Sequence, residues 1–497
     1  AKMVEDSAEP IVMTKEEAEA EKLLAVQSDY IRRRFDCSDF YLVYYPYILR
    51  TFGKRGSGIL SEKTENELTD CLLGFRYWID EPGNDAMWFW SENHALMFHT
   101  CQLLAGELFP DEVFTNSGLT GRQMQAKAKN MLYDWFVTFR KEGFTEWNSS
   151  PYLPIDTLGF GSLYAFAQDP AMRELGREGM DFAYYLLAVH SQQGIFASSS
   201  GRTYIKEQFG NWSNCPSGLS WIGYGYGVPG HAGKGITSYC LSDYEPPKEF
   251  AQWFSIPRGK EMICQTTQGN DGYVDLYTYK TADYMMTSAN DFHPGEPGHQ
   301  ENPFQLTFNA VAQLWVTHPG ERVLFGAARP SYWAGNGTLP KVNQYKAFAG
   351  LIYDIAPEHP VDFTHLYLPS MEFDRCEVEG KWAFVQLGSA YAAVYCSNGI
   401  RMQDFGSNKD RECIAEGRRC IWLVRAAQAD EFAAFDDFKA AMRGAALDAD
   451  AEGRRYRLVD PVSGELRCQW GETLYVNDAP MQYSGFDNYG KLTMQEK

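Results

Sequence analysis

The sequence predicts an α+β protein with two domains, a helical domain followed by an antiparallel β domain. Its 497 residues exceed what a single ordinary hydrophobic core organises. Apolar residues recur with the helical period in the first part of the chain, and from Glu261 they recur with the period of two that is typical of strands. We therefore expect helical hairpins over residues 15–257 and sandwich-like antiparallel sheets over residues 258–490.

Composition narrows the class of partner and the cellular compartment. A net charge of −20 argues against nucleic acid and against an anionic membrane surface as partners. No apolar run is long enough to predict a transmembrane helix, so we expect no membrane contact. The 11 cysteines are odd in number and include no C-x-x-C pair, which favours a reducing, cytoplasmic compartment, with a removed signal peptide as the open alternative. The acidic charge and the large β half permit a homo-oligomer.

Seven helices are expected before residue 190, with short loops and no strand pattern between them. The helix expected over residues 38–51 is apolar on all sides, which indicates that it is buried. Ser61, Ser91 and Thr120 precede the third, fourth and fifth helices, and hydroxyls at such positions cap free amides of the first turn. The expected ranges are 15–34, 38–51, 61–78, 91–108, 121–141, 157–168 and 170–190.

Between His190 and Lys260 the chain is dominated by glycine, serine, proline and aromatic residues, which indicates a long ordered loop of the kind that usually carries function. A short helix at 247–254 is expected to end the helical domain. Beyond it, alternating residues and turn signals predict strands, and one amphipathic helix is expected at 431–444. The expected strands are 273–279, 282–288, 305–317, 346–354, 382–397, 419–425, 454–458 and 473–477.

One stretch, from Trp88 to His99, combines aromatic plates with polar groups at the start of a helix. Aromatic rings can stack on the apolar face of a sugar, and polar side chains in the first helical turn can bind its hydroxyls and its leaving oxygen. The simpler interpretation is helix capping with a structural histidine. The candidate residues here are Trp88, Trp90, Glu92, Asn93 and His94.

A second half-site follows the fifth helix and again combines an acid, a tryptophan, an amide and a tyrosine: Glu146, Trp147, Asn148 and Tyr152. In a ring of helical hairpins, alternate loops gather at one end, so this loop and the loop after the third helix are expected to face each other. Under the alternative interpretation, the aromatic residues only anchor the loop.

Two further segments carry candidate groups. Arg202 offers a planar fork suited to a carboxylate, and Tyr204 offers a phenol that can donate or abstract a proton. His299 lies in a loop rich in glycine and proline, six residues after His293, which is not a zinc-binding spacing. We therefore expect no metal and no cofactor, and the alternative for Arg202 is a surface ion pair in an acidic chain.

Several enzyme classes are disfavoured by missing motifs. The sequence contains no G-x-S-x-G nucleophile elbow, no phosphate-binding or dinucleotide-binding glycine loop after a strand, and no H-E-x-x-H metal motif.

The order of the two halves, with Asn93-His94 opening an inner helix, resembles the toroid-plus-sheet polysaccharide lyases, which include the alginate lyases and the heparinase II/III-like enzymes. The resemblance covers the architecture of most of the chain. It implies an (α/α) toroid for residues 15–257, with an Asn-His pair and a tyrosine on the toroid loops carrying the chemistry. The usual alginate-lyase motif is Asn-Asn-His, whereas this chain has Glu92 before the pair, and that added negative charge favours a hydrolase.

We expect a carbohydrate-active enzyme that cleaves a uronic-acid-containing glycan by β-elimination, with a glycoside hydrolase and a non-catalytic glycan-binding protein as the alternatives. A lyase acting on a uronic-acid-containing glycan would neutralise the uronate with Asn93 and Arg202, take the adjacent proton with His94 or a tyrosine, and protonate the leaving oxygen with Tyr204 or Tyr152. A glycoside hydrolase would use Glu92 and Glu146 as its two carboxylates. A non-catalytic glycan-binding protein would need the tryptophans alone.

Overall fold

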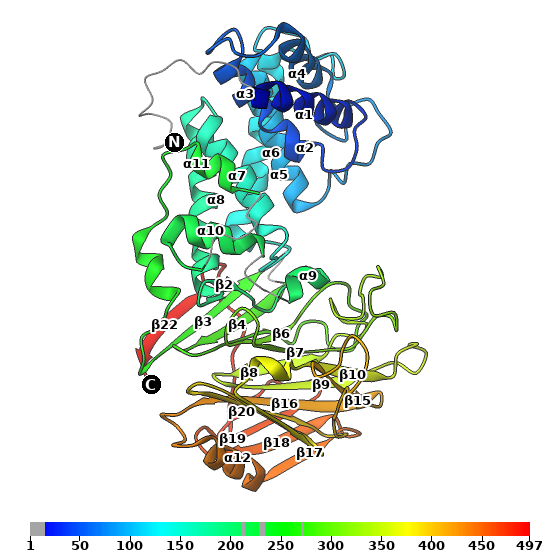
Figure 1. Ribbon diagram of the computed structural model, residues 1–497, viewed down its shortest axis with the longest axis vertical. Helices are drawn as coiled ribbons and strands as arrows, with labels where there is room; N and C mark the ends of the chain where they lie inside the picture. The colour runs from blue at the N-terminus through cyan, green and yellow to red at the C-terminus, as the bar shows by residue number, and fades with distance from the viewer. Residues whose placement is uncertain (1–14, 210–213, 228–233, 270–272) are drawn as a thin grey trace. The chain divides into compact units, whose positions relative to one another are not determined.

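The computed structural model describes residues 15–209, 214–227, 234–269 and 273–497. The chain forms two compact units whose segments interleave along the sequence. Unit 1 consists of Ala1–Arg140, Tyr152–Ala183 and Gly233–Pro246, and unit 2 of Lys141–Pro151, Tyr184–Ala232 and Pro247–Lys497. The α+β class predicted from the change of period is confirmed, with helices in the first half of the chain and antiparallel sheets in the second (Figure 1).

Unit 1 is built from helices, and the last residues of α6 and α8 belong to unit 2. The helices are α1 Lys15–Arg32, α2 Asp39–Leu42, α3 Tyr45–Phe52, α4 Glu62–Gly74, α5 Glu92–Leu108, α6 Gly121–Glu142, α7 Leu153–Phe166, α8 Pro170–Val189 and α11 Ile236–Cys240.

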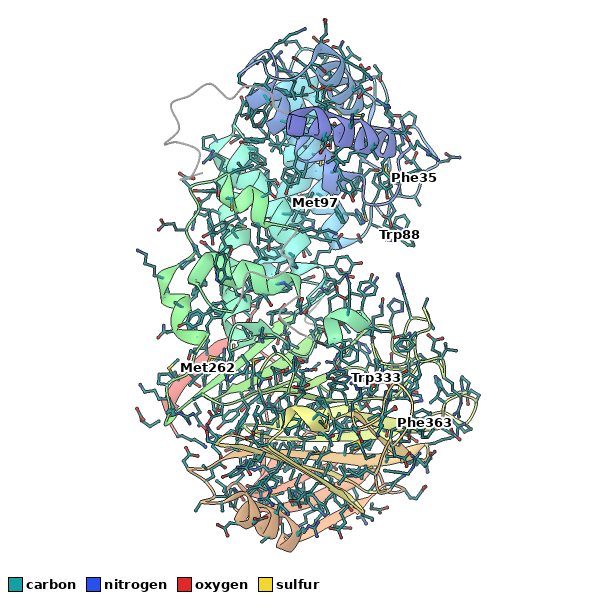
Figure 2. The ribbon with its side chains drawn as sticks, viewed as in Figure 1. Phe35, Trp88, Met97, Met262, Trp333 and Phe363 are labelled. Carbon is teal, nitrogen blue, oxygen red and sulfur yellow. The ribbon has the colours of Figure 1, made fainter. Side chains whose placement is uncertain are left out.

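Helix α5 is buried on nearly every side, although its buried residues include polar ones such as Asn93, His99 and Gln102. It packs closely against α7, where a Cβ on Gly159 would lie 2.8 Å from the Leu96 side chain. Met97 lies inside the helical unit, whereas Trp88, just before α5, lies at its surface (Figure 2).

Two local predictions are corrected. The single helix expected over 38–51 is interrupted between Leu42 and Tyr45, and Pro46 lies in the first turn of α3, where its missing N–H leaves no helical hydrogen bond unmade. Ser61 caps α4 by accepting a hydrogen bond from the Thr64 amide at 3.2 Å, as expected. Ser91 precedes α5 with extended backbone, but within the described residues its hydroxyl makes no capping hydrogen bond.

Unit 2 is organised around antiparallel sheets. In the described part of the chain, the largest sheet has the order β14-β15-β10-β7-β6-β5-β4-β3-β22, the second β11-β12-β13-β16-β9-β8 and the third β17-β18-β19-β20-β21, with β1 and β2 forming a separate pair. Side chains from all three of these sheets share one hydrophobic core, for example Leu306 of β6, Leu351 of β9 and Leu458 of β18.

The strands of unit 2 are β1 Ser191–Gln192, β2 Ile195–Phe196, β3 Lys260–Gln268, β4 Val274–Lys280, β5 Met285–Asn290, β6 Phe304–Thr307, β7 Gln313–Thr317, β8 Lys341–Tyr345, β9 Phe348–Asp354, β10 Phe363–Tyr367, β11 Arg375–Glu379, β12 Trp382–Leu387, β13 Ala390–Cys396, β14 Arg401–Met402, β15 Glu412–Glu416, β16 Arg419–Gln428, β17 Leu447–Asp450, β18 Arg455–Asp460, β19 Gly464–Gln469, β20 Tyr475–Val476, β21 Ala479–Pro480 and β22 Lys491–Glu496. Its helices are α9 Ile205–Gln208, α10 Cys215–Tyr224 and α12 Phe435–Gly444, with short 3-10 turns η1 Lys248–Trp253 and η2 Ser370–Glu372.

Two segments expected to be single strands are hairpins instead. Residues 305–317 contain β6 and β7, because the Asn309 side chain accepts hydrogen bonds from the amides of Val311 and Ala312 and closes a turn. Residues 382–397 contain β12 and β13, which are joined at Gly388 in the left-handed region (φ 54°). Of the helices in the described ranges, none is both long and apolar enough to cross a bilayer.

Candidate functional site

The candidate residues belong to two units, and each group is described by itself. Unit 1 holds Trp88, Trp90, Glu92, Asn93, His94 and Tyr152, and unit 2 holds Glu146, Trp147, Asn148, Arg202, Tyr204 and His299. That Glu92, Asn93, His94, Glu146, Tyr152 and Arg202 line one cleft at the mouth of a helical ring stays a prediction.

In unit 1, His94 is buried and held on two sides. Its Nδ1 lies 2.8 Å from Oδ2 of the fully buried Asp39, and the Phe40 ring is stacked on the imidazole with 4.9 Å between ring centroids. Burial opposes the charged imidazole, but hydrogen bonds with Asp39 and Cys37 outweigh it and raise the pKa of His94 to about 10.

The other side of the imidazole faces the turn between α1 and α2. His94 Nε2 lies 3.6 Å from Asp36 Oδ1, and the Cys37 sulfur belongs to the same cluster. Cys37 has a φ of 65°, an unfavourable conformation for a residue with a side chain. Sequence analysis missed Asp36, Cys37 and Asp39, although an acid at the start of an apolar, aromatic run signals a buried partner.

The tryptophans expected to stack on sugars are exposed on unit 1. Trp88 and Trp90 are 52% and 62% exposed, and their rings meet edge to face with centroids 5.5 Å apart. Trp88 has a φ of 50°, so its backbone adopts a conformation that few bulky residues take. The pair forms an exposed aromatic surface directly before α5.

The remaining candidates of unit 1 lie at helix starts. Glu92 is the first residue of α5, and its backbone carbonyl accepts a hydrogen bond from the Trp135 indole at 3.2 Å. Asn93 follows it and is buried. Tyr152 precedes α7, and its carbonyl accepts the amide of Asp156.

In unit 2, three loops far apart in sequence are joined by backbone hydrogen bonds. Ser200 and Asn302 exchange both of their amide–carbonyl bonds, and Thr203 N–H donates to the carbonyl of Gln300 at 3.0 Å. Gly201 N–H donates to the Trp147 carbonyl at 2.8 Å. These bonds hold the segments that carry Glu146, Arg202, Tyr204 and His299 in one place.

At this junction a phenol lies among cationic groups. Arg202 Nη2 donates to the Tyr204 hydroxyl at 3.3 Å, and the guanidinium groups of Arg202 and Arg329 each lie 5.6 Å from the centroid of the Tyr204 ring. Glu146 Oε1 lies 3.9 Å from Arg202 Nε. Arg329 was missed by sequence analysis, because nothing in its local pattern distinguishes it from other surface arginines.

The exposed His299 belongs to the same cluster. Partial burial lowers the pKa of its imidazole, and the positive charges of Arg202 and Arg329 lower it further, against the opposing effect of Glu301. His299 is therefore neutral at neutral pH and able to accept a proton.

Trp147 and Asn148 are buried rather than presented to solvent. Trp147 packs edge to face against Phe292 and belongs to a core cluster with Leu276 and Leu339. This favours the interpretation in which Trp147 anchors its loop, and we do not assign it a stacking role.

A scan against models of protein families finds no match to the chain, and a search of curated proteins finds no significant similarity.

Proposed function

We propose that the chain is a carbohydrate-active enzyme that cleaves a uronic-acid-containing oligo- or polysaccharide by β-elimination. The observation that carries the proposal is the Tyr204 phenol flanked by the guanidinium groups of Arg202 and Arg329, next to the imidazole of His299. Within a chain of net charge −20, this concentration of cations suits a negatively charged substrate group.

The chemistry needs three roles, and this cluster offers a residue for each. Arg202 and Arg329 would pair with the uronate carboxylate and stabilise the negative charge that develops when the adjacent carbon loses its proton. His299, neutral at neutral pH, would accept that proton. Tyr204 would donate its hydroxyl proton to the leaving oxygen as the carbon–oxygen bond breaks, leaving a carbon–carbon double bond in the uronate.

Three further residues have supporting roles. Glu146, 3.9 Å from Arg202, would orient the guanidinium. The exposed pair Trp88 and Trp90 gives unit 1 an aromatic surface of its own, on which sugar rings would stack. The finer expectation for the helical half, an (α/α) toroid like that of the polysaccharide lyases, is part of the same proposal.

The experiment is an assay of purified chain against a panel of polyuronates and neutral glycans, in which ultraviolet absorbance and new reducing ends are measured together. Elimination predicts both signals, because each cleavage produces an unsaturated uronate. Reducing ends without absorbance would mean hydrolysis and would replace the proposal with one that uses Glu92 and Glu146. Binding of glycans with neither signal would mean a non-catalytic glycan-binding protein.

A further inference from the structure

We infer that Asp36, Cys37 and His94 of unit 1 form a binding site for a divalent metal ion of the zinc class. The inference goes beyond the proposed glycan cleavage, since it concerns unit 1 alone and its test does not use activity. It also departs from the sequence-based expectation of no metal, which rests on the His293–His299 spacing and on the missing H-E-x-x-H motif.

The three side chains carry donor atoms of the kinds that zinc binds. The three residues offer a carboxylate oxygen, a thiol sulfur and an imidazole nitrogen, and these atoms all lie within 4.8 Å of one another. Zinc prefers these ligand types, at about 2.0–2.3 Å, so that adjacent ligand atoms lie roughly 3.4 Å apart in a tetrahedral site. The separation of 3.6 Å between His94 Nε2 and Asp36 Oδ1 is close to that value.

The His94 ring is held in place by Asp39 and Phe40. Metal-binding histidines usually hydrogen-bond through their other ring nitrogen to a carboxylate, which fixes the ring and its tautomer. His94 Nδ1 lies 2.8 Å from Asp39 Oδ2, and the Phe40 ring is stacked on the imidazole. Nε2 is thereby directed at Asp36 and Cys37, and a metal ion bound there would displace the Nε2 proton.

The backbone and the access to the site complete the argument. Cys37, whose sulfur lies within 4.8 Å of the His94 and Asp36 ligand atoms, has a left-handed φ of 65°, and such unfavourable conformations cluster at functional sites. The Asp36 side chain is 55% exposed, so an ion can enter from solvent. With three protein ligands, a tetrahedral ion keeps a fourth position for water or for an oxygen of a ligand.

The test is cobalt(II) titration of chelator-treated full-length protein, followed by competition with zinc(II). We expect one ion per chain and an intense thiolate-to-cobalt charge-transfer absorption that zinc abolishes. Cys37→Ser removes this absorption, whereas Cys240→Ser, which changes an exposed cysteine of the same unit, keeps it. Asp39→Asn retains the absorption but weakens affinity by about 10- to 100-fold, as loss of a supporting carboxylate does elsewhere.

A second variant of a metal ligand distinguishes the loss of a ligand from misfolding of the protein. Asp36 is exposed, so Asp36→Asn keeps the fold, as circular dichroism can verify, and lowers the affinity for cobalt. No charge-transfer absorption in the wild-type protein, or the same absorption in Cys37→Ser, would overturn the inference. Rapid alkylation of Cys37 that is unaffected by zinc would overturn it too and identify a thiol–imidazole pair instead.

Discussion

Gly201 lies directly against the indole of Trp147, so closely that a Cβ at position 201 would come within 2.6 Å of Trp147 Nε1. Trp147 is buried, and Gly201 donates its amide to the Trp147 carbonyl. The residue that follows, Arg202, donates a hydrogen bond to the candidate phenol of Tyr204. The absence of a side chain at position 201 therefore allows the Arg202 loop to lie against Trp147.

Gly201→Ala should displace the Arg202 loop, because a buried indole cannot move aside without strain. We expect destabilisation of about 1–3 kcal/mol, typical of an overpacked contact, and loss of most activity toward polyuronates. Denaturant unfolding and the absorbance assay measure the two effects. Gly444→Ala is the matched control, since a Cβ there meets no atom within 4 Å at the end of α12, and its stability should be unchanged or slightly higher.

Tyr204→Phe should abolish proton donation while leaving the ring between the two guanidinium groups. We expect kcat to fall by about 10²- to 10⁴-fold, the usual contribution of general acid–base catalysis, with little change in KM. Tyr133→Phe, which removes an exposed hydroxyl from unit 1, should leave both constants unchanged. Equal losses in the two variants would argue against a catalytic phenol.

Arg329→Gln should act mainly on substrate binding, because it removes one of the two cations beside Tyr204. We expect a higher KM for polyuronates and a weaker dependence of kcat/KM on salt. Arg401→Gln is the control, an exposed arginine whose guanidinium bonds to Gln403. Wild-type kinetics in Arg329→Gln would remove Arg329 from the site.

Three buried histidines should make the protein sensitive to mild acid. Burial lowers the pKa of each of His99, His190 and His318 to about 3. Because the unfolded chain has histidine pKa values near 6.5, it binds protons that the folded chain does not, so stability is full above about pH 6.5 and falls as the pH drops toward 3. Each histidine should contribute a slope of about 1.4 kcal/mol per pH unit.

Unfolding measured between pH 7.5 and pH 5 tests this sensitivity. His190→Gln should reduce the pH dependence, because it removes one of the three buried imidazoles. Stability that is flat across this range would show that the buried imidazoles gain protons in the folded state.

A buried ion pair joins two of the sheets. Arg425 of β16 lies 2.8 Å from Asp460 at the end of β18, and both side chains are almost fully buried. Asp460→Asn leaves a buried guanidinium with less compensation and should destabilise unit 2 by about 3–5 kcal/mol. The exposed pair Arg457 and Glu465 provides the comparison, since Glu465→Gln should change stability by less than about 1 kcal/mol.

The division into a helical half and a β half was predictable from the spacing of apolar residues. A helix or strand that buries one face repeats its apolar residues at the spacing of that element. The break in the apolar segment 38–51 was not predictable from periodicity. A segment that is buried on all sides has no alternation of apolar and polar residues to show where a helix ends. Pro46 was the available signal, because proline favours the first turn of a helix.

The site was predictable only in part, for a similar reason. Arg202, Tyr204 and His299 were selected for their chemistry, and the structure brings them together in unit 2. Arg329 and Asp39 became candidates only through their tertiary contacts. The Arg329 guanidinium lies 5.6 Å from the Tyr204 ring centroid, and the Asp39 carboxylate lies 2.8 Å from His94. A single sequence does not record such contacts.

Strand β22 pairs with β3 along six residues, from Lys491 opposite Gln265 to Glu496 opposite Lys260. The segment between them contains the other strands of the two larger sheets, so this outer edge of β3 is left unprotected while almost all of unit 2 is being synthesised. An unprotected strand edge is a template for pairing with a neighbouring chain. Until β22 has been synthesised, neighbouring nascent chains can therefore pair with one another through this edge of β3.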